Sequence, residues 1–299
     1  MKKSLLVTGG TGCIGYQLLP TLVEAGYQLW VLTRRPVDAL NTLGGRIHYV
    51  NDLSEVGEVG GVINLAGEGI VDARWSESRK QALLDSRIGV TEHLLEWIAS
   101  LEKTPEVLIS GSAVGYYGYQ DSSDELDESA PGQQDFASTL CQRWEAAAAR
   151  ATDLGVRVCL LRTGVVLASN GGALARMLVP FKLGLGGPIA SGEQMISWIQ
   201  REDLVAIILF LLHSKELTGA FNATAPSPVT NRCFSESLAK VLGRPCWLPV
   251  PGYAMRMLLG DAADLLVKGQ SVVPKRLLQL GFEFRYPQIS DAIAHSLGE

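Results

Sequence analysis

The sequence has 299 residues, of which 47% are hydrophobic and 19% charged, and its formal net charge is −5. This length and apolar content suit one large domain, or a nucleotide-binding domain with a smaller partner region. The absence of a basic tract or a long apolar run excludes nucleic acid and the membrane as expected partners, and five scattered cysteines without metal-type spacing favour a reduced, cytoplasmic protein without a metal site.

An apolar strand, a glycine-rich turn and a helix follow one another at the start of the chain. The strand is predicted over 4–7 and the helix over 16–25, with glycines between them in the spacing G-x-x-G-x-x-G. Such a turn brings backbone N–H groups and a helix N-terminus up to a pyrophosphate, so it predicts a bound dinucleotide. The alternative is a strand-to-helix turn without a ligand. The predicted contacts of this turn are Gly9, Thr11, Gly12, Cys13, Ile14 and Gly15.

The second predicted strand, 29–32, ends in two arginines. NAD-binding sites place an acid there for the ribose 2′-OH, whereas arginine accommodates the 2′-phosphate of NADP. Here Arg34 and Arg35 stand in place of the acid, and a guanidinium is a planar, permanently charged partner for phosphate. The sequence therefore predicts NADP in preference to NAD. The alternative is a pair of solvated surface arginines.

The following elements alternate between strands and helices, which is typical of a parallel sheet built from βαβ units. We predict an α/β fold of the Rossmann type, with a doubly wound parallel sheet. Residues 1–165 form the predicted NADP-binding domain, with sheet elements added from about 190–225. Residues 166–299 form a smaller substrate-side α/β region that includes a C-terminal domain at about 248–296. The predicted strands are 47–50, 61–64, 107–110 and 156–161, and the predicted helices are 78–100, 136–154 and 204–212.

These motifs resemble the extended short-chain dehydrogenase/reductase superfamily. The likeness runs through residues 8–15, 64–67, 109–118 and 197–203. More narrowly, the chain resembles the atypical branch of NAD(P)-dependent epimerase family proteins that carry a C-terminal domain of unknown function. Further markers of that branch are Ser86-Arg87-Ile88, Trp144-Glu145, Gly171-Gly172, Gly186-Gly187, 194–199 and 222–228.

The resemblance implies roles for residues at the ends of other strands. Ser112 matches the serine that hydrogen-bonds the reacting oxygen of the substrate, and the alternative is a strand-end turn residue. Asp52 falls where an acid meets the adenine amine, and the alternative is a solvated loop acid. The cofactor contacts implied outside the glycine turn and the two arginines are Asp52, Leu53, Leu65, Ala66, Gly67, Ser110, Arg162, Thr163 and Gly164.

One part of the family pattern is missing. Active members carry Tyr-x-x-x-Lys on the helix after the serine strand, where the lysine lowers the pKa of a proton-shuttling tyrosine. Alignment on Glu145 places Ala137 and Cys141 at these two positions. The catalytic candidates are therefore Ser112, Tyr116 and Tyr117, and the substrate-contact candidates are Glu68, Arg87 and Trp198.

Two classes of function follow from these features. The first is an NADP(H)-dependent oxidoreductase or epimerase-like enzyme that acts on a small carbonyl or hydroxyl compound or a sugar nucleotide. The second is a non-catalytic NADP(H)-binding redox sensor or interaction protein, because the proton-shuttling pair is absent. The resemblance also implies a homodimer formed through the helices 78–100 and 136–154.

Overall fold

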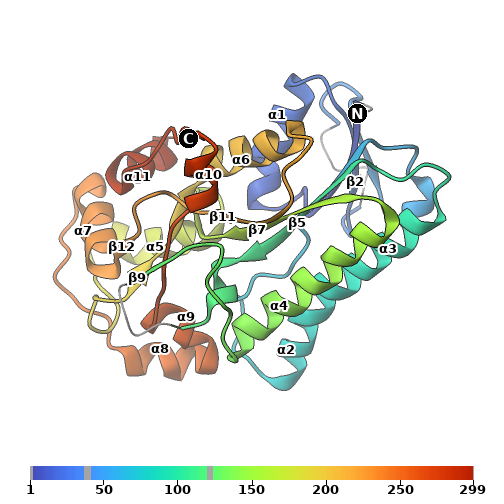
Figure 1. Cartoon of the computed structure of the whole chain (residues 1–299). Coiled ribbons are helices and arrows are strands. Elements are labelled where there is room, and N and C mark those ends of the chain that lie inside the picture. Colours follow the sequence, from blue (N-terminus) through green and yellow to red (C-terminus); the bar gives the residue numbers. More distant parts are fainter. Residues whose placement is uncertain (1–2, 37–41, 120–123, 299) are drawn as a thin grey trace.

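Seven parallel strands form the central sheet of the computed structural model, which describes residues 3–36, 42–119 and 124–298 (Figure 1). All six pairings in this sheet are parallel. Their order is β11-β7-β5-β4-β1-β2-β3, so the chain reverses its direction across the sheet between β1 and β4. This arrangement confirms the predicted doubly wound α/β fold, in which ligands bind beyond the carboxyl ends of the strands near the reversal. The strands are β1 (Ser4–Thr8), β2 (Gln28–Leu32), β3 (Ile47–Val50), β4 (Gly61–Asn64), β5 (Val107–Ala113), β7 (Arg157–Thr163) and β11 (Gly219–Ala223).

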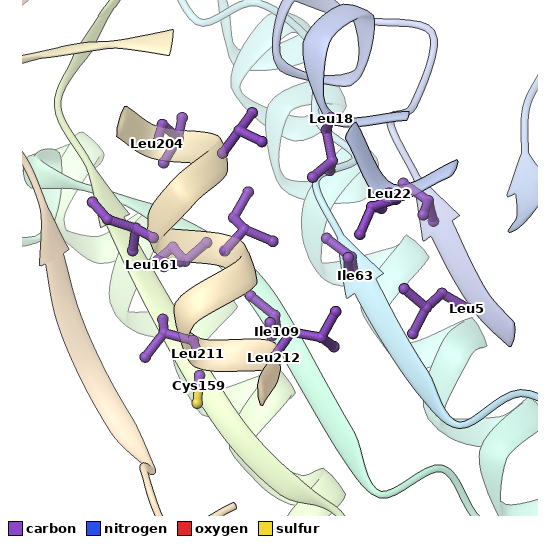
Figure 2. Close-up of a cluster of buried hydrophobic side chains, with 14 of the residues drawn as sticks. Leu5, Leu18, Leu22, Ile63, Ile109, Cys159, Leu161, Leu204, Leu211 and Leu212 are labelled. Carbon is purple, nitrogen blue, oxygen red and sulfur yellow. The ribbon is translucent and has the colours of Figure 1, made fainter. Parts of the chain in front are cut away.

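Helices cover both faces of the sheet (Figure 1). On one face lie α1 (Cys13–Glu24) and α6 (Arg201–His213), and on the other lie α3 (Val90–Ser100) and α4 (Phe136–Ala149). The strand sequences explain both layers, because successive side chains point to opposite faces. Leu5 of β1 joins the cluster under α1 and α6, shown in Figure 2, whereas the neighbouring Leu6 joins the cluster under α3 and α4.

The predicted helix over 78–100 is not continuous, which corrects the sequence-based prediction. It consists of α2 (Glu77–Leu84), a π-helical turn over Asp85–Gly89, and α3. Ser76 caps the start of α2 by accepting a hydrogen bond from the backbone N–H of Arg79 at 3.1 Å. A π turn shifts the side chains that follow it around the helix axis, and such turns are common at functional sites.

The C-terminal half adds a second core beside the sheet. Trp198, Phe234, Leu178 and Ile293 come from four different elements and pack together there. Within the described ranges, none of the helices is long and apolar enough to cross a membrane. The elements of this half and the remaining short ones are β6 (Glu125–Leu126), β8 (Val165–Leu167), α5 (Gly172–Lys182), β9 (Met195–Ile196), β10 (Trp198–Gln200), β12 (Val229–Thr230), α7 (Asn231–Leu242), α8 (Gly252–Leu259), α9 (Asp264–Val267), β13 (Ser271–Val272), α10 (Lys275–Gln279) and α11 (Ile289–Gly298).

Candidate functional site

The glycine-rich turn after β1 is shaped by close backbone contacts. Gly9 has a φ of +69°, and a Cβ atom there would lie 2.4 Å from the carbonyl oxygen of Leu65. A Cβ atom on Gly15 would lie 2.0 Å from the carbonyl oxygen of Gly10, so only glycine lets α1 approach the turn. The N-cap of α1 is Gly12, which provides no side-chain cap, and the first turn holds no acid. The backbone N–H groups at the start of α1, together with the helix dipole, therefore fit the phosphates of a dinucleotide.

The arginines predicted to select NADP lie at the end of β2, beside β1. The side chain of Arg34 is 87% exposed, and its Nη1 atom lies 3.6 Å from a carboxylate oxygen of Glu68, which follows β4. The same carboxylate contacts Arg79 of α2. Because β2 and β4 flank β1, the contact between Arg34 and Glu68 spans the carboxyl end of β1. An exposed ion pair of this kind contributes little stability, so Arg34 is free to turn toward another anion.

A chain of buried hydrogen bonds holds the end of β4 against β1. The hydroxyl of Thr8 donates to Oδ1 of Asn64 at 2.6 Å and accepts from the backbone N–H of Ala66 at 3.2 Å. The Asn64 amide donates to the hydroxyl of Thr91 at 2.9 Å, and the Trp144 indole donates to the same hydroxyl at 3.2 Å. These contacts fix the backbone over residues 65–67, which the resemblance places under the adenine ribose and phosphates.

Arg87 lies on the π turn, and its side chain contacts the end of the same segment. Its Nη2 atom donates to the carbonyl oxygen of Glu68 at 2.8 Å, and a Cβ atom on Gly67 would lie 3.0 Å from its guanidinium carbon. The guanidinium also lies over the Trp144 ring, 5.4 Å from its centroid. Burial lowers the pKa of Arg87 from its usual value. The π turn thus explains how Arg87 reaches the strand ends, while its contact with a substrate stays a prediction.

Ser112, at the carboxyl end of β5, is tied to a buried ion pair. Its hydroxyl donates to Oε1 of Glu145 at 2.6 Å, and the Arg162 guanidinium donates to both oxygens of that carboxylate at 2.9 Å. Glu145 and Arg162 are only 7% and 4% exposed. Burial alone would lower the pKa of Arg162, but the hydrogen bonds and charge of Glu145 outweigh burial and raise it. The guanidinium of Arg162 is committed to this network, which leaves the backbone of 162–164 and the half-buried Thr163 side chain for the predicted cofactor contact.

The two candidate tyrosines have different environments. The Tyr117 hydroxyl donates to Oδ1 of Asn222 at 2.6 Å and accepts from Arg162 at 2.9 Å, and its side chain is completely buried. Burial raises the pKa of Tyr117 to about 12. The structure therefore gives Tyr117 a structural role in place of the predicted catalytic one. Tyr116 is half-buried, with its ring centroid 3.4 Å from the guanidinium carbon of Arg162, and it stays a catalytic candidate.

The positions of the missing Tyr-x-x-x-Lys motif are closed by the chain itself. Ala137 and Cys141 are both buried on α4. A Cβ atom on Gly115 would lie 3.5 Å from the Ala137 Cβ and 3.6 Å from the Cys141 Sγ, so the turn over Val114–Tyr117 packs directly on this helix. Ser138 secures the turn by donating to one of its carbonyls at 2.5 Å. In addition, none of the eight tyrosines in the sequence is followed four residues later by lysine.

The burial of Cys141 makes its reactivity predictable. Burial raises its pKa to about 12, so we expect its thiol to stay unmodified by a thiol-specific disulfide reagent near neutral pH while the protein is folded. Cys233 is exposed and serves as the matched control that reacts readily. Peptide mapping by mass spectrometry before and after denaturation measures both thiols. Labelling of Cys141 at the rate of Cys233 would contradict the packing of the turn on α4.

Several other residues predicted to contact the cofactor or the substrate cap a turn or are buried within the fold. Asp52 caps a short 3₁₀ turn by accepting a hydrogen bond from the backbone N–H of Ser54 at 2.8 Å. Hydrogen bonds from the side chain and backbone of Ser54 lower the pKa of Asp52. Leu53 and Ser110 are buried, so their side chains do not face an open groove. Trp198 is also completely buried, and its indole donates to the Ser227 carbonyl at 3.0 Å. Packing in the C-terminal core therefore replaces the predicted substrate contact of Trp198.

The sequence-based predictions missed the polar residues that support the site from behind. Asn64, Thr91 and Asn222 hold strand ends and Tyr117 in place. Asn64 and Asn222 lie in the segments 64–67 and 222–228 that carry the resemblance, but no role was assigned to them, and the signal for Thr91 was only a polar residue in an apolar segment. Within the residues that the structure describes, no group of three or more His, Cys, Asp or Glu side chains is placed to hold a metal ion. None of the five cysteines, all of which the structure describes, forms a disulfide bond.

Comparison with known proteins agrees with this architecture. The model of the NAD dependent epimerase/dehydratase family matches residues 5–223, and that of a domain of unknown function (DUF1731) matches residues 250–296. The epimerase family protein SDR39U1 of Mus musculus is 39% identical over 297 residues, covering 97% of this chain and 98% of the mouse protein. The chloroplastic homologue of that protein from Arabidopsis thaliana is 40% identical over 301 residues, covering 98% of this chain and 86% of the plant protein.

Solved structures share the fold over the whole chain. The crystal structure of human epimerase family protein SDR39U1 (isoform 2) with NADPH is 34% identical, with a TM-score of 0.90 and coverage of 99% of both chains. A nucleoside-diphosphate sugar epimerase from Corynebacterium glutamicum is 30% identical, with a TM-score of 0.78, covering 99% of this chain and 58% of that one. These matches confirm the predicted resemblance and its C-terminal domain.

Proposed function

The chain belongs to the NAD dependent epimerase/dehydratase family, and from that premise we propose that it binds NADP(H) and acts as an oxidoreductase on a small carbonyl or hydroxyl compound. The observation that carries the proposal is the uncapped glycine turn of α1 with Arg34 and Arg35 beside it at the same edge of the sheet. The human relative solved with NADPH supports the same cofactor. A true sugar-nucleotide epimerase is less well supported, because that chemistry relies on the missing tyrosine.

Each part of the site has its own role in binding NADP(H) and the reacting compound. The glycine turn holds the pyrophosphate, the two arginines hold the 2′-phosphate, and residues 65–67 lie under the adenosine half. When bound, NADP(H) supplies or accepts a hydride equivalent. Tyr116, half-buried just after β5, donates to the oxygen of the reacting compound, and the Ser112 hydroxyl, whose proton goes to Glu145, accepts from a hydroxyl of that compound. Glu145 holds the Ser112 hydroxyl in one orientation.

Cofactor preference provides the direct test. In calorimetric titrations we expect NADPH to bind more tightly than NADH, because two guanidinium groups pair with the extra phosphate. The variant Arg34→Ala/Arg35→Ala should weaken NADPH binding by about 10- to 100-fold, since each charged hydrogen bond contributes about 1.5–3 kcal/mol before solvent screening. Binding of NADH should change little.

Arg46 and Arg244 provide a matched control, because both are exposed arginines remote from the glycine turn in sequence. The variant Arg46→Ala/Arg244→Ala should leave both affinities unchanged. Equal affinity of the wild-type protein for the two cofactors would contradict the phosphate clamp. Failure to bind either cofactor, with none carried through purification, would replace the enzymatic proposal with an interaction role.

A further inference from the structure

The turn after β2 carries the two arginines assigned to the 2′-phosphate, and the side chain of Asn51 holds this turn. Asn51 directly follows β3, the strand that pairs with β2 at the edge of the sheet. Its Nδ2 atom donates to the carbonyl oxygen of Thr33 at 2.6 Å and to that of Arg35 at 3.2 Å. The two donors of one amide therefore bind the carbonyls on either side of Arg34.

Two further hydrogen bonds hold the same turn. The backbone N–H of Thr33 donates to the carbonyl oxygen of Val50 at 2.9 Å, which continues the pairing of β2 with β3 beyond Leu32. The backbone N–H of Arg35 donates to the hydroxyl of Thr33 at 3.1 Å, in the manner of a threonine turn. Thr33 is only 8% exposed. The backbone over 33–35 is therefore anchored on a buried residue, while the side chain of Arg34 extends into solvent.

The anchored turn presents Arg34 toward the carboxyl end of β1. There its Nη1 atom lies 3.6 Å from one carboxylate oxygen of Glu68, and the other oxygen contacts Arg79. An anionic group thus already meets Arg34 beside the glycine turn, on the side of the sheet where a dinucleotide binds. The contact is exposed and weak, and Glu68 keeps Arg79 as a partner, so a phosphate can replace the carboxylate at Arg34.

We propose that Asn51 is a positioning residue that strengthens the preference for NADP(H) over NAD(H), an inference that rests on the proposed cofactor. Asn51 acts through the backbone that carries Arg34 and Arg35. A turn that is held before the cofactor arrives loses less conformational entropy when its arginines meet the 2′-phosphate. An aspartate of the same shape has no N–H donor for the two carbonyls, and its charge would repel the phosphate. The role therefore requires an amide at this position.

Calorimetric titrations of the full chain with NADPH and NADH test the inference. We expect Asn51→Ala to weaken NADPH binding by about fivefold and to change NADH binding by less than about twofold, since NADH has no 2′-phosphate. Thr33→Val removes the acceptor of the Arg35 N–H and should weaken NADPH binding by about twofold. Titrations with 2′,5′-ADP and 5′-ADP isolate the contribution of the 2′-phosphate, and Asn51→Ala should weaken binding of 2′,5′-ADP alone. Asn51 is exposed, so its substitution leaves the core intact.

Gln28 provides a matched control, because it is an exposed amide at the opposite end of β2. Gln28→Ala should bind both cofactors like the wild-type protein. When Asn51→Ala is added to Arg34→Ala/Arg35→Ala, it should cause no further loss, because the arginines through which it acts are absent. Circular dichroism should show that all variants are folded.

Three results would overturn the role of Asn51 while leaving the proposed cofactor in place. These are an unchanged preference for NADPH in Asn51→Ala, an equal loss of NADPH and NADH binding, or a further loss in the combined variant. Equal affinity of the wild-type protein for NADPH and NADH would overturn both this inference and the proposed phosphate clamp.

Discussion

The substitution Glu145→Ala is expected to lower the free energy of unfolding by about 3–5 kcal/mol, because it leaves the Arg162 guanidinium buried without its partner. Arg162 is 4% exposed, and two of its hydrogen bonds end on the lost carboxylate. The hydroxyl of Ser112 loses its acceptor at the same time. Urea denaturation followed by circular dichroism measures the change.

Two further variants make this expectation specific to the buried pair. In Glu145→Leu/Arg162→Met both charges are replaced by apolar groups, so this double variant should be more stable than Glu145→Ala. Glu193→Ala removes one partner of the exposed pair with Arg232 and should change stability by less than about 0.5 kcal/mol. A loss of the same size in Glu145→Ala and Glu193→Ala would show that burial of the pair does not set its contribution.

The fold was predictable because its signals are local and repeated. The strands 47–50 and 61–64 agree with β3 and β4, since apolar runs bounded by polar or glycine residues report strands directly. The π turn after α2 was not predictable, because the sequence over 78–100 keeps helical periodicity and contains no proline. Tertiary contacts stabilise the π turn, including the hydrogen bond from Arg87 to the Glu68 carbonyl.

The site was predictable only where it depends on backbone geometry. Glycines at 9, 12 and 15 mark the turn because their lack of a Cβ atom is required there. Side-chain roles were harder to predict, since Tyr117 and Trp198 have the composition of site residues but lie in fully buried surroundings. Whether an aromatic residue contacts a substrate depends on which elements cover it, and this is decided by packing between segments distant in the sequence.

Because the turn over Val114–Tyr117 packs on α4, we predict that the missing motif cannot be restored by substitution. In Ala137→Tyr/Cys141→Lys, the new phenol meets the turn at Gly115. The new ammonium group is buried near the Glu145 carboxylate and the Arg87 guanidinium, and it competes with Arg162 for Glu145. We expect the free energy of unfolding to fall by more than about 4 kcal/mol, beyond the range of most single substitutions. Thermal unfolding followed by circular dichroism, together with solubility on expression, measures this loss.

The outer face of the same helix supplies a control with the same motif. Thr139 and Arg143 are exposed and also four residues apart, so Thr139→Tyr/Arg143→Lys creates Tyr-x-x-x-Lys without touching the turn. This variant should unfold within about 0.5 kcal/mol of the wild-type protein. If Ala137→Tyr/Cys141→Lys were as stable as this control, the turn over Val114–Tyr117 would have to move away from α4. The space that it fills would then be open to a tyrosine and lysine, and the absence of the motif would no longer have a steric explanation.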